Sequence, residues 1–598
     1  MKARVKTALR EALRWDWGAF VFAIVSTACC MGAGCIALGR RVMGLSGAAV
    51  LSWITPGYAA VLVVVALVLA AVLYCVAALI FRGYRASVDK RAGVSSGSVL
   101  SYKKCLKKYF WVYALVIFAC WTPWIIAHLP GTYDQDTIWQ ALIYRNPACW
   151  YDHHPWFTTA LFGGVLDAGV QLGSQSITLM LYTVFQAVFT AGMFSCLFCY
   201  LKRFTLPTVL FRLCFIVVCA FPVYASFASQ MVKDSLFALA WIPFMIMYVE
   251  AIRTRGACLN SLPRILLFIA AIVLALLSRK TGIYLIAPAL LVLVFFVAAK
   301  WRIRWSAVLV VVVAFSVVWS SVLLPSFGVA KGPSKELYSC PLQQTARYVA
   351  LYPDEVTEAE KAAIDGVLPY DSLWSLYQVN NADAVKDSFK SPSNDKMIAY
   401  FAAWAGMGLK HPLTYATATL GTNEALFLPL VPYTLKDNFS TDLVDENVRF
   451  FTAFTSGGLS AEEVTQRSAI TAEGLTRFSG LDGVHSVMAT YEKAINYTPL
   501  RVLNSPSFMA FYIPLLLGCF LLSFRSRGLH RWRIALALIP AFLLVASLVV
   551  GPLVLARYCI PAAYVMPLLV ALPWIMGVRT CSAAPGSVDG KREATNEH

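Results

Sequence analysis

Aspartates and histidines gather in two short polar segments of an otherwise apolar sequence. The stretch 130–140 (PGTYDQDTIWQ) contains Asp134 and Asp136, and 150–156 (WYDHHPW) contains His153 and His154. A positioned carboxylate can take a proton from a substrate, and a histidine can orient one. Either pair alone is more often a solvated loop or a helix cap, so the prediction of a site depends on what lies beside them.

Basic side chains mark three further turns between apolar runs. The turns are 229–234 (SQMVKD), 278–282 (SRKTG) and 551–558 (GPLVLARY), and they contribute Lys233, Asp234, Arg279, Lys280, Arg557 and Tyr558. If they meet the two acidic segments, cations stand beside carboxylates. That mixture suits a site that accepts a proton while it holds an anionic leaving group. Alternatively, Lys233 and Asp234 form a simple interfacial ion pair, and the other cations extend to lipid headgroups.

The elements that must position these residues are membrane-spanning helices. The 598-residue chain is 59% hydrophobic and 14% charged, with a mean hydropathy of +0.66, whereas soluble proteins average about 25% charged residues. Apolar runs of about 20 residues can cross a bilayer as helices. We therefore expect an all-α polytopic membrane protein with about twelve spans, at 17–38, 57–81, 109–129, 178–201, 206–225, 235–251, 263–278, 283–299, 305–324, 507–523, 534–551 and 559–578. The first follows a basic leader and is expected to be an uncleaved anchor.

The distribution of charge predicts the orientation of the chain. The net charge is +18, but basic residues concentrate in the short loops, and acidic residues outnumber them in 325–505. Cytoplasmic loops carry an excess of Lys and Arg, so both termini are expected in the cytoplasm of a cell-membrane protein, and no nucleic-acid partner is expected. Counting 157–173 as a span would invert this orientation, which favours an interfacial or re-entrant helix there.

The predicted spans divide the chain into five parts. These are a two-helix extension with a basic cytoplasmic linker (1–108), a membrane core with a first outer loop at 130–177 (109–324), an extracytoplasmic domain (325–505), C-terminal transmembrane helices (506–578) and a cytoplasmic tail (579–598). Most of the cysteines lie in apolar runs, where they act as small hydrophobic residues. Cys149 and Cys340 both fall in outer segments and could form one disulfide.

The order of these motifs resembles the GT-C superfamily of membrane glycosyltransferases, in the branch of protein mannosyltransferases and aminoarabinose transferases. Residues 133–136 (YDQD) match its acidic motif in the first outer loop, 153–156 (HHPW) loosely match a Pro-Pro element, and 557–561 (RYCIP) match a late Arg-Tyr-x-x-Pro element. The sequence also resembles a bacterial multi-pass family of unknown function that shares the turns at 233–234 and 279–282. Trp156 replaces the second proline and Asp-Gln-Asp replaces an Asp-Glu pair, which leaves open which aspartate is the base.

The resemblance implies a GT-C-like fold and a glycosyltransferase that acts outside the cytoplasm. The donor would be a polyprenyl-phosphate-linked sugar, and the acceptor would be an envelope glycan, lipid or protein. Asp136 or Asp134 would act as the catalytic base. The substrate-binding residues would be His153, His154, Lys233, Asp234, Arg279, Lys280, Arg557 and Tyr558. No cofactor is expected, although the three aspartates could supply oxygen ligands to a divalent metal, as in some members of the superfamily.

Two other classes of protein stay open from the sequence. The near absence of ionisable residues within the spans argues against a proton-coupled carrier. It does not argue against an envelope transporter of lipid or glycan. The third class is a non-enzymatic membrane scaffold with 325–505 as its binding domain.

Overall fold

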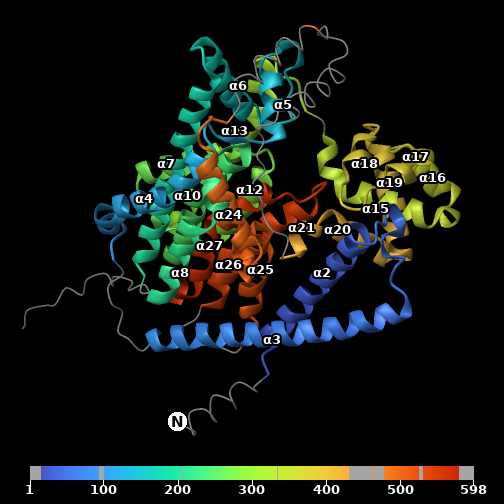
Figure 1. The fold of residues 1–598 in the computed structure, drawn as a ribbon, viewed down its shortest axis with the longest axis horizontal. Coiled ribbons are helices and arrows are strands. Elements are labelled where there is room, and N and C mark those ends of the chain that lie inside the picture. The colour runs from blue at the N-terminus through green and yellow to red at the C-terminus, as the bar shows by residue number, and fades with distance from the viewer. Residues whose placement is uncertain are drawn as a thin grey trace, which may run out of the picture.

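The computed structural model describes residues 15–92, 100–204, 206–332, 334–429, 462, 477–523 and 530–577. Most of these residues lie in helices, and the described part of the chain contains one sheet of two short strands. The basic leader at 1–14 and the tail at 579–598 lie outside the described residues. The model thus agrees with an almost entirely helical protein (Figure 1).

The first half of the chain forms long apolar helices with shorter helices between some of them. They are α2 (Trp17–Arg41), α3 (Pro56–Ala92), α4 (Tyr102–Ala127), α5 (Gln135–Tyr144), α6 (Trp156–Gln171), α7 (Gln175–Lys202), α8 (Thr208–Ala220), α9 (Pro222–Ser229), α10 (Lys233–Thr254), α11 (Leu262–Ser278), α12 (Gly282–Phe296) and α13 (Ala299–Val318). Strand β1 (Thr132–Tyr133) precedes α5, and β2 (Gln230–Met231) precedes α10.

The second half of the chain begins with short outer helices and ends in three apolar ones. The outer helices are α15 (Ser339–Leu351), α16 (Glu358–Asp365), α17 (Tyr370–Leu376), α18 (Asp383–Asp387), α19 (Asn394–Lys410), α20 (Pro412–Thr422), α21 (Glu424–Phe427) and α24 (Asp482–Asn496). The apolar helices are α25 (Pro506–Phe520), α26 (Arg531–Val549) and α27 (Ala556–Gly577).

Every predicted span coincides with helix, but not all of these helices are long enough to cross a bilayer alone. Eight of the described helices have the length and apolar composition of a span, and α8 with α9 could form a ninth that bends by 55°. Three more, α11, α12 and α25, are apolar but have 17 residues or fewer. The model therefore agrees with a polytopic membrane protein, while the number of twelve spans stays a prediction.

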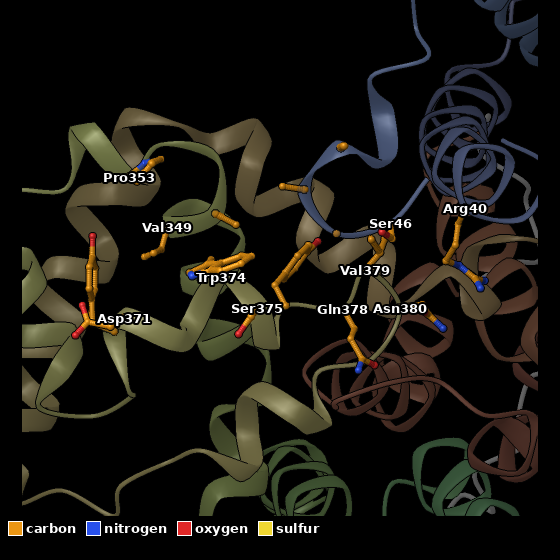
Figure 2. Close-up of a pocket in the computed structure, with 16 residues that line it drawn as sticks. Arg40, Ser46, Val349, Pro353, Asp371, Trp374, Ser375, Gln378, Val379 and Asn380 are labelled. Carbon is orange, nitrogen blue, oxygen red and sulfur yellow. The ribbon is translucent and has the colours of Figure 1, made fainter. Parts of the chain in front are cut away.

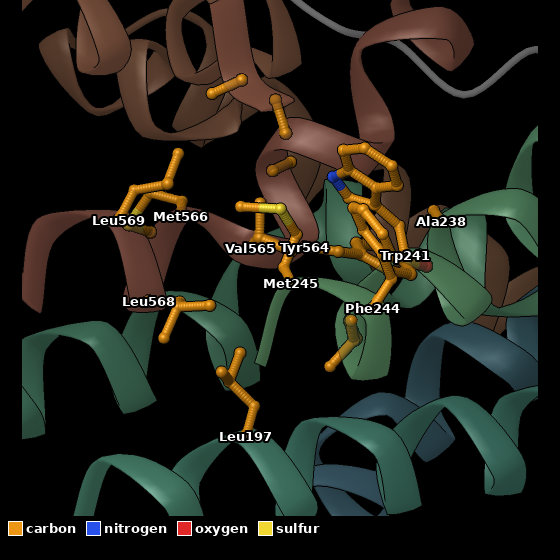
Figure 3. Close-up of a cluster of buried hydrophobic side chains, with 14 of the residues drawn as sticks. Leu197, Ala238, Trp241, Phe244, Met245, Tyr564, Val565, Met566, Leu568 and Leu569 are labelled. Atoms are coloured by element: carbon orange, nitrogen blue, oxygen red, sulfur yellow. The ribbon is translucent and has the colours of Figure 1, made fainter. Parts of the chain in front are cut away.

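The centre of the bundle is α27, whose apolar span is completely buried by other helices. It packs on α10 and α25, and Figure 3 shows Trp241, Phe244 and Met245 of α10 beside Tyr564 and Val565 of α27. In contrast, only 11% of the α3 span is buried inside the protein. An apolar helix that is so exposed is stable in lipid and would be unstable in water, so the model favours a bilayer as the surroundings of this chain.

Helices α15–α20 pack into a body beside the bundle, next to the C-terminal end of α2 (Figure 1). Ile36 of α2 and Val50 of the following loop are buried in its apolar core. In the same region, buried Glu424 pairs with Arg40 at 3.0 Å and with Arg41 at 2.6 Å. Helices α2 and α3, here called the N-terminal hairpin, therefore join the body formed by α15–α20, here called the outer body. The join consists of apolar packing and the ion triplet of Arg40, Arg41 and Glu424.

One disulfide, between Cys149 and Cys340, was left open by the sequence. The structure does not join these two cysteines. Cys149 lies 2.9 Å from the amide of Asn146, and Cys340 lies 3.8 Å from the hydroxyl of Thr419. Each thiol is thus held by a neighbour in its own surroundings.

Candidate functional site

The parallel pairing of β1 with β2 joins the first outer loop to the start of α10. Asp134 follows β1 and caps α5, where its carboxylate accepts a hydrogen bond from the amide of Gln135 at 2.7 Å. Asp136 lies in the first turn of α5, and Lys233 is the first residue of α10. The two-residue sheet therefore places an acidic helix start beside a basic one.

Helix α7 supports this sheet at two positions. Gly131 adopts φ +143°, and a Cβ there would overlap the hydroxyl of Thr183, so the close approach of the loop to α7 requires glycine. Gln186 is buried and donates hydrogen bonds from Nε2 to the carbonyls of Ala228 and Gln230, at 3.0 and 2.9 Å. Sequence analysis missed Gln186, although a glutamine inside an apolar helix was a signal for such a role.

Asp136 is the carboxylate on which the cations converge. Its Oδ2 lies 2.6 Å from Lys233 Nζ and 3.1 Å from Arg557 Nη2, and 20% of its side chain is exposed. Burial alone would raise the pKa of Asp136, but Lys233 and Arg557 outweigh burial and hold this pKa well below its usual range. Asp136 is therefore ionised while both cations stay in contact with it.

Arg557, in the first turn of α27, is surrounded by carboxylates. Its guanidinium pairs with Asp134 and Asp136, and its Nε lies 3.7 Å from Asp234 Oδ2. Only 8% of the Arg557 side chain is exposed. One arginine thus links the first outer loop, the start of α10 and the last helix, although their segments lie up to 423 positions apart in sequence (557 minus 134).

Neutral His154 completes the surroundings of Lys233. Its Nδ1 lies 2.8 Å from Lys233 Nζ. Burial and the neighbouring ammonium hold the pKa of His154 well below its usual value. The uncharged ring can accept a hydrogen bond from Lys233. The adjacent His153 also has a lowered pKa, chiefly because it is buried.

Lys280 holds the other end of the histidine segment. Its Nζ lies 2.9 Å from Asp152 Oδ2 and also donates to the Asp152 carbonyl. Burial raises the pKa of Asp152, although Lys280 opposes this rise. On the other side, the backbone amide of Asp152 donates to the carbonyl of Ala330 at 2.8 Å, so the segment after α13 secures the same turn. Asp152 was not among the predicted site residues.

Arg279 differs from Arg557 because, within the described part of the chain, it forms no ion pair with a carboxylate. Its guanidinium lies 5.5 Å from the ring centre of Phe237 and 5.8 Å from that of Tyr558. Its Nε donates to the hydroxyl of Thr281 at 2.9 Å. Stacking on aromatic rings orients a guanidinium without neutralising it. Arg279 is therefore an oriented cation, and its charge also acts on the buried carboxyl group of Asp234.

The model brings the predicted site residues into one outer cluster. Asp134, Asp136, His154, Lys233, Asp234, Arg557 and Tyr558 form its centre, Arg279 contacts Tyr558, His153 follows the turn beside His154, and Lys280 pairs with Asp152. The described residues contain no group of three or more His, Cys, Asp or Glu side chains arranged to hold a metal ion. The catalytic and binding roles of these residues stay predictions.

An outer charged cluster supported by a buried helical bundle defines a membrane protein with a candidate site at one end of its helices. Residues 141–583 match the model of a family of unknown function, DUF6020. The chain belongs to this family. The matched range includes every cluster residue from Asp152 onward but begins after Asp136. No curated protein and no solved structure matches the chain.

Proposed function

We propose that this protein is a membrane glycosyltransferase of the GT-C type that uses a polyprenyl-phosphate-linked sugar outside the cytoplasm. The observation that carries the proposal is the contact of Asp136 with Lys233 and Arg557 beside Arg279, which forms no direct ion pair with a carboxylate of the described residues. A proton acceptor and an available cation then stand in one partly buried site. Sugar transfer from a phosphate needs both.

The cluster is divided into an acidic side and a cationic side. Asp134, Asp136 and Asp234 all surround Arg557, so its charge is compensated. Arg279 has no such partner among the described residues. We assign Arg279 as the first ligand of the donor phosphate and Arg557 as the residue that positions the aspartates. A guanidinium binds phosphate with strong charge-assisted hydrogen bonds.

In the proposed reaction, the acceptor hydroxyl attacks the anomeric carbon of the sugar. The bond between this carbon and the phosphate oxygen breaks, and the polyprenyl phosphate leaves with the electron pair. Asp136 accepts the hydroxyl proton, which balances the reaction without an oxidant or a second nucleotide. Arg279 and Lys233 stabilise the charge that develops on the departing phosphate.

The same ion pairs suggest how donor binding prepares the base. In the free protein, Lys233 and Arg557 make Asp136 a weak base because they hold its pKa well below the usual range. A phosphate placed near Lys233 would compete for its ammonium and weaken the contact with Asp136. The pKa of Asp136 would then rise toward the range in which a base is effective. Proton transfer would thereby depend on a bound donor.

The test is transfer by the purified full-length protein in lipid nanodiscs. Radiolabelled polyprenyl-phosphate sugars would be incubated with envelope extract as the source of acceptors, and the water-soluble and lipid products would be counted. We expect Asp136→Asn to lower the rate by roughly 10²–10⁴-fold, the usual contribution of a positioned base. Asp134→Asn is the second variant, because either aspartate could be the base.

Asp167→Asn is the matched control. Asp167 lies on α6 of the same outer loop and pairs with Arg145 at 2.6 Å, outside the charged cluster, so its loss should leave transfer nearly unchanged. Wild-type activity in both Asp136→Asn and Asp134→Asn would refute the assigned chemistry. Movement of intact donor across vesicles without any turnover would identify a transporter instead.

A further inference from the structure

A cavity lies between the N-terminal hairpin and the outer body. Its volume is about 940 Å³, within the range of pockets that hold small molecules. Figure 2 shows Trp374 in its middle, with Asp371 toward one end and Arg40 toward the other. In Figure 1, the elements that form it, α2 and α17, lie apart from α5.

The lining of this cavity combines aromatic rings with neutral polar groups. Trp374 is 64% exposed although it is a large apolar side chain, and Tyr370 and Tyr377 lie on the same wall. Hydroxyl and amide groups come from Ser375, Gln378, Asn380 and Ser46. Trp374 thus presents an aromatic face to solvent beside several hydrogen-bonding side chains.

The charge of the lining argues against an anionic ligand. Arg40 is its single cation, and Glu424 already pairs with it at 3.0 Å. Asp371 is exposed and forms no ion pair among the described residues. The triplet of Arg40, Arg41 and Glu424 keeps one positive charge, which the acidic Asp371 of the lining offsets. The pocket therefore favours a neutral or weakly cationic ligand that carries many hydroxyl groups.

We infer that this cavity binds a pyranose saccharide, which makes it a glycan site separate from the charged cluster. One face of a pyranose ring presents polarised C–H groups, which suit the electron-rich face of Trp374. The ring hydroxyls suit Asp371, Gln378 and Asn380 as hydrogen-bond partners. Under the proposed function, the ligand would be part of the acceptor glycan, held away from the point of transfer.

The pocket also depends on the hairpin that the family match leaves out. Its lining includes 46–49 of the loop after α2 together with 349–380 of the outer body, while the family match begins at residue 141. Two parts of the chain thus build one site. A chain of this family without the hairpin would lack one wall of the pocket.

Saccharide binding can be measured without any transfer reaction. A protein that does not bind saccharide can therefore be distinguished from one that does not catalyse the proposed transfer. The full-length protein in nanodiscs would be titrated with mannotriose, triacetylchitotriose and glucosamine trisaccharide, and binding would be followed by saturation-transfer difference NMR. Inorganic phosphate and glycerol 3-phosphate serve as anionic probes. We expect at least one trisaccharide to bind and neither phosphate probe to compete with it.

Trp374→Ala should weaken that binding about tenfold or more, and Asp371→Asn should weaken it to a smaller extent. Tyr497→Ala is the control, because Tyr497 is an aromatic residue that is 87% exposed and lies outside the pocket. Absence of binding by all three trisaccharides at millimolar concentration overturns the inference. Unchanged binding by Trp374→Ala, or displacement of the saccharide by phosphate, overturns it equally.

Discussion

Replacing Arg279 or Arg557 by methionine should separate ligand binding from internal support of the site. Both residues are arginines at outer helix ends, and methionine keeps much of the apolar stem of each. Arg557 is 8% exposed and lies within ion-pair distance of three carboxylates. Removing one partner of a buried ion pair costs about 3–5 kcal/mol, so Arg557→Met should lose about this much stability.

Arg279→Met should cost less stability, because Arg279 forms no direct ion pair with a carboxylate of the described residues and acts on buried Asp234 only from a longer distance. Its contacts with Phe237 and Tyr558 are worth about 0.5–1 kcal/mol each at partly exposed positions. In contrast, a hydrogen bond from a charged group to phosphate contributes about 1.5–3 kcal/mol. Arg279→Met should therefore weaken donor binding roughly 10- to 150-fold.

Two measurements on the same nanodisc samples test this contrast. Thermal unfolding followed by tryptophan fluorescence gives the stabilities, and a filter-binding titration with radiolabelled polyprenyl-phosphate sugar gives the affinities. Arg145→Met is the control for the loss of an ion-paired arginine, because Arg145 caps the end of α5 and pairs with Asp167 outside the cluster. Donor binding by Arg279→Met at wild-type affinity would refute the phosphate role. Unfolding of Arg557→Met at the temperature of Arg279→Met would refute the supporting role of Arg557.

Two further predictions concern stability. Glu424→Gln should lower the free energy of unfolding by about 1–3 kcal/mol, because it leaves Arg40 and Arg41 without their shared carboxylate. The thermal unfolding temperature should fall accordingly, and an unfolding temperature equal to that of the wild type would contradict this prediction. The pKa of His154 is lowered in the folded protein, so this histidine binds a proton more readily in the unfolded chain. The free energy of unfolding should therefore fall as the pH falls below about 6.5, by about 1 kcal/mol at about pH 5.5. His154→Asn should lose this part of the pH dependence in chemical denaturation, and equal pH profiles would count against it.

Hydropathy alone located the helical spans because each needs an apolar run of about the bilayer thickness. The same signal could not set their number, since α11, α12 and α25 are apolar but short. The sequence left open whether the segments holding Asp136, Lys233 and Arg557 converge, and the structure places these three side chains in contact. Residue type thus indicated several side chains of the cluster but not Asp152.

Partner choice within the cluster could not be predicted from the sequence. Nothing near Arg557 or Arg279 indicates that the first is surrounded by three carboxylates and the second stacks on two rings. These differences arise from the packing of α27 on α10 and from the two-residue sheet, which depend on contacts distant in sequence. Similarly, the sequence does not distinguish an apolar residue that faces lipid from one that faces protein. Ile36 and Val50 are apolar residues that pack in the core of the outer body.

The helix ends at the cluster explain why it contains carboxylates at all. Helices α10 and α27 begin there, with Lys233 and Arg557 in their first turns. Cations at helix N-termini are unfavourable, because the exposed amides already carry partial positive charge. Asp136 offsets this excess in the free protein, at the position where an anion would be attracted. A donor phosphate that bound at these helix ends would replace Asp136 as the anion beside Lys233 and Arg557. Binding of the leaving group would then free the Asp136 carboxylate to act as the base, so the two steps would occur together.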